Sequence, residues 1–174
     1  MSSALSAEQR GVRRGAALGA LSTLLVLAAA LLLGRDHAAG AENPIVFAIR
    51  WSLVPMLWLL VAVGAVAQAR FFSADDIAGS GFSPPGPKLR IQAAVLQNTF
   101  EQAVLAVGAY LGLAASGRAW ALAAIPALAL LFSAGRVAFW NGYRSGAAGR
   151  AFGFGLTFYP TALAYGLAVA LALR

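Results

Sequence analysis

Five long apolar stretches limit what this chain can fold into. An α-helix needs about 20 apolar residues to cross the hydrocarbon core of a bilayer, and each stretch has that length or nearly so. Only 11% of the residues are charged, whereas soluble domains carry about 25%, so a water-facing surface cannot be covered. The chain is therefore predicted to be an all-α integral membrane protein. The predicted spans are Gly15 to Gly34, Trp51 to Ala69, Ile91 to about Ala115, the run between Arg118 and Arg136, and Ala151 to Leu173.

The first stretch has two interpretations. Arg10, Arg13 and Arg14 precede it and small residues follow at 38–41, which is also the order of features in a cleaved signal peptide. The apolar region of a signal peptide is about 7–15 residues long, and this one is longer, so we favour an additional transmembrane helix. Residues 1–43 then form a cytoplasmic tail with the extra helix (or a signal segment), and residues 44–174 form a four-helix transmembrane domain.

The basic residues indicate an orientation. If all five stretches span, nine arginines and lysines lie on one side and four on the other. The positive-inside bias then places the N-terminus in the cytoplasm and the C-terminus outside. The net charge of +7 does not indicate a nucleic-acid partner, because the basic residues lie singly or in pairs between apolar stretches and form no continuous face.

Glu101 is the only acidic residue inside any of these stretches. A carboxylate at such a depth is costly and usually faces the bundle interior with a partner, so we expect an interior position for it. On a helix, Arg90 and Gln97 lie within about 40° of Glu101, and Asn98 lies about 60° away. This polar face could be a hydrogen-bond cluster that fixes helix packing, or a ligand-binding face.

A second group, Arg136, Tyr143 and Arg150, is spaced by seven and seven residues. Arginine in this position could clamp a carboxylate or stabilise a thiolate. The alternative is contact with lipid headgroups. Since the chain has no cysteine, any thiol chemistry must use a substrate thiol.

A metal site or a soluble cofactor fold is not predicted. The one histidine, His37, has only Asp36 and Glu42 nearby, which is too few ligands for a metal. There is also no glycine-rich phosphate loop that follows a strand.

Two segments resemble the MAPEG family, the membrane-associated proteins in eicosanoid and glutathione metabolism. They are RIQAAVLQNTFEQAVLAVGAYLGL and GRVAFWNGYRSGAAGRAFGFGLTFYP, and the resemblance covers roughly residues 50 to 173. It implies a four-helix bundle, here with an additional N-terminal transmembrane helix, that assembles as a homotrimer. It also implies a bacterial inner-membrane location and glutathione bound between adjacent subunits, near the cytosolic side.

The resemblance implies a role for each candidate residue. Asn98 and Glu101 match the pair that holds the polar ends of glutathione, and Arg150 matches the catalytic arginine that stabilises its thiolate. Tyr143 matches a tyrosine of the same site. The remaining candidate cofactor-binding residues are Arg70, which resembles the basic residue at the end of the family's first helix, and Arg90 and Arg136.

The implied function is a glutathione-dependent transferase or peroxidase-like activity on hydrophobic electrophiles, with membrane lipids as surroundings. Two positions depart from the family pattern. Ala94 stands where active members commonly have arginine, and Phe139 replaces a second tyrosine. They motivate an alternative, a non-catalytic trimer that binds lipid or serves as a scaffold. A small transporter is a weaker alternative, because the chain shows no internal repeat.

Overall fold

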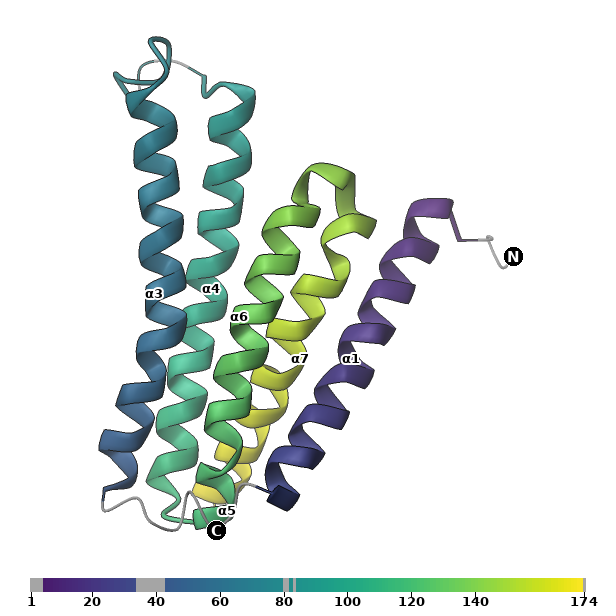
Figure 1. The fold of residues 1–174 in the computed structure, drawn as a ribbon, viewed down its shortest axis with the longest axis vertical. Coiled ribbons are helices and arrows are strands. Elements are labelled where there is room, and N and C mark those ends of the chain that lie inside the picture. Colours follow the sequence, from purple (N-terminus) through teal and green to yellow (C-terminus); the bar gives the residue numbers. More distant parts are fainter. Residues whose placement is uncertain (1–4, 34–42, 80–81, 83, 174) are drawn as a thin grey trace.

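The computed structural model describes residues 5–33, 43–79, 82 and 84–173, and within these ranges the regular structure is entirely helical (Figure 1). This confirms the all-α prediction. His37 and the small residues at 38–41 lie outside the described residues. The elements are α1 (Ala7–Leu33), α3 (Pro44–Phe71), α4 (Pro87–Ala115), α5 (Ala119–Leu122), α6 (Ala124–Gly142), the 3-10 turn η1 (Tyr143–Ser145) and α7 (Gly146–Ala172).

Most of these helices are apolar enough to suit a membrane, whereas α4, for which the sequence also predicts a span, is not among those that meet the length and hydropathy of a membrane span. Within the described ranges, Ala7–Leu33, Pro44–Phe71 and Ala119–Ala172 are long and apolar enough to cross a bilayer, and the last of these contains α5, α6 and α7. Large apolar side chains on α1 and α3 point outward, among them Leu24, Leu25 and Leu60. Exposed leucines of this kind suit a lipid environment and support a membrane protein with lipid contacts.

The long helices run up and down, and their connections gather at two ends (Figure 1). The start of α1, the α3–α4 connection and the η1 turn lie toward one end, while the C-terminus and the α4–α5 connection lie at the other. The two basic connections are therefore on the same side as the start of α1, in agreement with the arginine count. Which side faces the cytoplasm stays a prediction.

Local sequence signals set the helix starts. The Asn43 side-chain oxygen accepts hydrogen bonds from the backbone N–H groups of Ile45 (3.0 Å) and Val46 (3.1 Å), and Pro44 occupies the first turn of α3. Such a cap satisfies donors that have no partner within the helix, and proline costs nothing there. Pro87 likewise opens α4. These signals extend both helices beyond the apolar stretches that predict them.

Helices α6 and α7 pack backbone against backbone. A Cβ atom on Gly135 would lie 2.6 Å from the Thr157 methyl carbon and 2.9 Å from the Gly153 carbonyl oxygen, so no larger residue fits. Gly112 approaches Ala168 as closely (2.8 Å), and Gly117 has a φ of +64° in the turn after α4. Close helix approach and turns therefore account for these glycines.

The loop between α3 and α4 is held by Asp76. Its carboxylate accepts hydrogen bonds from the Gly86 N–H (2.9 Å) and from the Ser73 hydroxyl (2.8 Å). These bonds, with a smaller contribution from the nearby charge of Arg70, hold the pKa of Asp76 below its ordinary value. Asp76 thereby fastens the loop to the start of α4, which carries Asn98.

We expect Asp76→Ala to loosen this loop. The carboxylate favours the folded loop above its unfolded pKa of about 3.9, and this contribution disappears as the pH falls through the lowered folded value. At neutral pH, limited proteolysis between α3 and α4 should therefore be several-fold faster in the variant than in the wild type. At a pH below the folded value the two should be cleaved at similar rates. Ile77→Ala, at an exposed position of the same loop, is the control, and equal cleavage of both variants at neutral pH would contradict the assignment.

Candidate functional site

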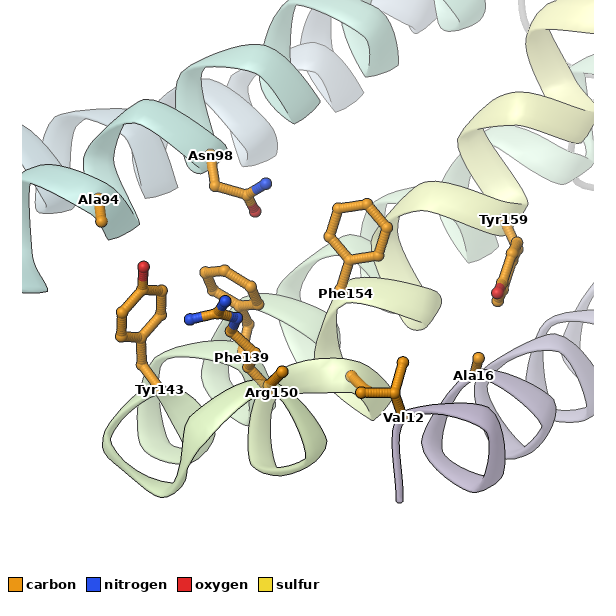
Figure 2. A pocket seen from close by; sticks show the side chains of 11 residues that line it. Val12, Ala16, Ala94, Asn98, Phe139, Tyr143, Arg150, Phe154 and Tyr159 are labelled. Carbon is orange, nitrogen blue, oxygen red and sulfur yellow. The ribbon is translucent and has the colours of Figure 1, made fainter. Parts of the chain in front are cut away.

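A pocket of about 450 Å³ opens between α4, the α6–α7 turn, α7 and α1. This volume lies within the range of about 300–1,000 Å³ that is usual for small-molecule sites. Figure 2 shows Asn98, Tyr143 and Arg150 around the same space. Three of the predicted site residues are thus brought together, although Asn98 is about 50 positions away from Arg150 in the chain. The other lining residues are Val12, Ala16, Ala94, Phe139, Ala147, Ala151, Phe154 and Tyr159.

Arg150 lies in the first turns of α7, and an aromatic ring holds its guanidinium. The guanidinium carbon is 4.6 Å from the centroid of the Tyr143 ring, which in turn meets the Phe139 ring edge-on at 5.4 Å. Arginine is attracted to the face of such a ring. No carboxylate pairs with Arg150 among the residues that the structure describes. Its charge is therefore available to an anion in the pocket.

Asn98 is oriented from behind by Arg136. The Arg136 Nη1 group donates to the Asn98 Oδ1 atom at 2.8 Å, and Nη2 donates to the Thr157 hydroxyl oxygen at 2.6 Å. Arginine can only donate, so it selects the amide oxygen of Asn98. The amide NH2 is then the end of the side chain left for the pocket. Together with Arg150 and the Tyr143 hydroxyl, Asn98 makes this side of the pocket rich in hydrogen-bond donors.

Arg136 itself is the largest fully buried side chain in the described part of the chain, and it is 1% exposed. Its guanidinium lies 4.6 Å from the Phe139 ring centroid and 5.6 Å from that of Phe132. It does not line the pocket. The structure therefore places Arg136 behind the pocket wall, where it contacts Asn98 and does not reach the pocket itself.

The expectation that Glu101 faces the bundle interior is wrong for the single chain. Glu101 is exposed, and its Oε1 atom accepts a hydrogen bond from the Gln97 Nε2 atom at 2.9 Å. The inner face of α4 is occupied by Thr99, Gln102 and a row of alanines, so the helical period turns Glu101 outward. Arg70 and Arg90 are exposed as well and do not line the pocket.

Several pocket residues could not be predicted from the charged residues and polar clusters of the sequence. Phe154 and Tyr159 lie on α7 beyond Arg150, and Val12 and Ala16 come from the N-terminal helix. The spacing of Arg150 and Phe154 by one helical turn could have indicated Phe154. Thr157 could not have been found from the sequence, because its role depends on the buried Arg136.

In the described ranges, no group of three or more His, Cys, Asp or Glu side chains lies where it could hold a metal ion. The donor-rich wall of the pocket suits an anionic, polar ligand. The apolar remainder of the pocket, which includes Phe154 and Ala151, suits an apolar group next to it.

Comparison with protein families gives one match. A sequence model described as the MAPEG family matches residues 45–170, a range that begins within the first turn of α3 and ends within α7. The range includes every pocket residue except the two on α1. Neither the search of curated proteins nor the search of solved structures returns a match.

Proposed function

Since this chain belongs to the MAPEG family of membrane proteins, we propose that it transfers glutathione to hydrophobic electrophiles, with transferase or peroxidase-like activity. The observation that carries the proposal is the Arg150 guanidinium, which pairs with no carboxylate of the described residues, stacks on Tyr143 and faces a pocket that also contains Asn98. A cation beside a thiol favours the thiolate, which is the reactive form. The donor-rich wall supplies partners for the carboxylates of a tripeptide such as glutathione.

The chemistry assigns separate tasks to these residues. Asn98 and Tyr143 orient the peptide, and Arg150 stabilises negative charge on the sulfur as the thiol proton leaves to solvent. The sulfur lone pair then forms a bond to the electrophilic carbon. The displaced group leaves with the electron pair of its own bond, or, for an activated double bond, that pair moves to the neighbouring carbon and takes up a proton. For a peroxide, the sulfur instead attacks one oxygen, the O–O bond breaks and the alcohol leaves after taking up a proton; a second glutathione then displaces the oxygen from the resulting sulfenic acid as water and forms glutathione disulfide. Preorganised charge of this kind can lower a barrier by a few kcal/mol.

Equilibrium binding of glutathione to the detergent-solubilised protein tests the proposal. We expect saturable binding, and we expect Asn98→Ala to weaken it about tenfold, the effect of losing about 1.4 kcal/mol of hydrogen bonding to a charged group. Asn141→Ala, at an exposed position near the same end of the bundle, should leave the affinity unchanged. The absence of saturable binding to the wild-type protein would contradict the proposed function.

The alternative, a non-catalytic member, is favoured by one observation. Ala94 and Phe139, the two departures from the family pattern, both line the pocket. The pocket therefore lacks the guanidinium that an arginine at position 94 would supply and the hydroxyl that a tyrosine at position 139 would supply. The variant Ala94→Arg distinguishes the two. A gain in glutathione affinity favours a glutathione site, and no gain favours a lipid-binding or scaffolding role.

A homotrimer is part of the proposal, and the outer face of α4 supports contact between copies of the chain. Glu101 stands at the midpoint of this helix and is exposed there with Gln97. A carboxylate at the centre of a bilayer costs about 2.5–3.5 kcal/mol on insertion scales, a cost that polar contacts in a neighbouring copy can remove. The same contacts would bring Glu101 to a site shared between subunits.

We expect the wild-type protein to have the mass of three chains in mild detergent. Glu101→Leu should shift the equilibrium toward the monomer, because the substitution removes both the cost of exposure and the polar contact. Sedimentation equilibrium measures the shift, with Gln68→Leu, at an exposed position of α3, as the control. An assembly that is unaffected by Glu101→Leu would show that the α4 face is not the interface.

A further inference from the structure

The N-terminal helix α1 is fastened to α7 along a row of glycines. Gly11, Gly15 and Gly19 are spaced by four residues and share one helix face. A Cβ atom at these positions would lie 2.6 Å from the Ala148 Cβ, 2.9 Å from the Ala151 Cβ and 3.0 Å from the Gly155 Cα, respectively. The two backbones therefore approach closely, as small residues allow in membrane helices.

A polar contact fixes the register of the two helices. The Glu8 Oε1 atom accepts a hydrogen bond of 3.0 Å from the Ala147 N–H, in the first turn of α7. A carboxylate at this position also suits the positive end of the helix dipole. Arg150 lies three residues after Ala147, so the contact holds α1 beside the cation of the proposed site.

This register places Val12 and Ala16 on the pocket wall (Figure 2). They are one helical turn apart and apolar, and they lie on the side of Phe154 and Tyr159 in the view. Asn98 and Tyr143 stand on the opposite side. The pocket is therefore divided into a donor-rich part on the side of Asn98 and Tyr143 and a mainly apolar part, in which the Tyr159 hydroxyl is the one polar side-chain group among the described lining residues. Helix α1 contributes only apolar side chains, and only to the second part.

We propose, on the basis of the proposed function, that α1 forms the wall against which the hydrophobic electrophile lies, and that Val12 and Ala16 set the size of the electrophile that the site accepts. The family match begins at residue 45, so this wall comes from outside the family domain. Glutathione contacts the other wall. Substitutions on α1 should therefore change acceptor selectivity and leave glutathione affinity unchanged.

Kinetics with a homologous series of 2-alkenals of increasing chain length tests this division. Ala16→Phe should lower kcat/KM for the longest members about tenfold or more and affect the shortest much less. Val12→Ala should extend the range toward longer members. Ala17→Phe is the matched control, because Ala17 is the exposed neighbour that does not line the pocket. Equal selectivity of the Ala16 and Ala17 variants, with turnover and glutathione affinity intact, would overturn the inference alone.

A readout that does not require turnover uses the absence of cysteine from the chain. Ala16→Cys introduces a single thiol, and we expect S-hexylglutathione to slow its alkylation by N-ethylmaleimide at least several-fold. S-methylglutathione, which likewise has no free thiol to consume the reagent but lacks the long alkyl chain, should slow it less. Ala17→Cys should be alkylated at the same rate with and without either compound. The inference would be overturned if Ala16→Cys were alkylated at the same rate with and without S-hexylglutathione while dialysis showed that this compound was bound.

Two further outcomes are informative. If dialysis shows that neither S-hexylglutathione nor glutathione binds, the proposed function fails and this inference fails with it. If the intact mass of the purified protein shows that α1 has been removed, the inference alone fails, since glutathione binding can still be measured on the remaining chain.

Discussion

Replacing Arg150 with alanine is expected to lower glutathione-dependent kcat by about 10²–10³-fold, the usual effect of removing one preorganised group that stabilises developing charge. Arg150 is the only cation on the pocket wall among the described residues, and no carboxylate there neutralises it. Without it, the pKa of the bound thiol should rise toward that of the free thiol. The rate should then recover at higher pH, so the pH profile of kcat moves in the alkaline direction.

Arg144→Ala is the control for this prediction. Arg144 is exposed in η1, one residue from Tyr143, and does not line the pocket. Arg150→Lys should restore part of the rate, since lysine keeps the charge but lacks the planar group that stacks on Tyr143. If the pH profile of kcat were unchanged in Arg150→Ala, Arg150 would not act by stabilising the thiolate, even if kcat fell.

The second large effect is expected for Arg136→Ala, which should lower the free energy of unfolding by about 2–5 kcal/mol, as truncation of a large buried side chain does. The substitution leaves a cavity between α4, α6 and α7 and removes the hydrogen bonds to Asn98 and Thr157. Thermal or denaturant unfolding in detergent measures the change. Arg118→Ala, at an exposed position, should change the free energy of unfolding little.

Arg136→Met separates stability from orientation. Methionine fills much of the same volume but cannot donate to Asn98, so the amide is no longer fixed in one orientation. We expect the stability to be closer to that of the wild type while glutathione affinity falls. If Arg136→Met bound glutathione as the wild type does, Arg136 would have a purely structural role.

The helices follow from the sequence because hydropathy locates their apolar centres. Their ends do not, because they depend on caps and turns. The stretch from Trp51 to Ala69 predicts α3, which begins seven residues earlier at the Asn43–Pro44 cap. The run between Arg118 and Arg136 likewise predicts α6, yet the chain forms the short α5 first and continues α6 to Gly142.

The site is predictable in part for a similar reason. Residue spacing and chemistry predict Asn98, Tyr143 and Arg150 as site residues, and the structure shows that all three line one pocket. Helical periodicity also places Glu101 on one face of α4 with its polar neighbours. Periodicity does not show whether that face packs against another helix of the same chain or lies on the outer surface of the bundle. The α1 wall is missed because Val12 and Ala16 are ordinary apolar residues, and only the packing of glycines against α7 gives them a position.

The packing of α7 has a practical consequence for redesign. This helix bears Arg150, Phe154 and Tyr159, and it also packs closely against both α1 and α6. A Cβ atom on Gly153 would lie 2.1 Å from the Phe139 backbone nitrogen, so no side chain fits there, and one on Gly155 would lie 3.1 Å from the Tyr159 ring. Most libraries of substitutions on α7 would therefore lose folded protein before they altered substrate scope. The pocket-facing positions of α1 have no such restriction, so a search for variants with new acceptors has its best prospects in the first helix.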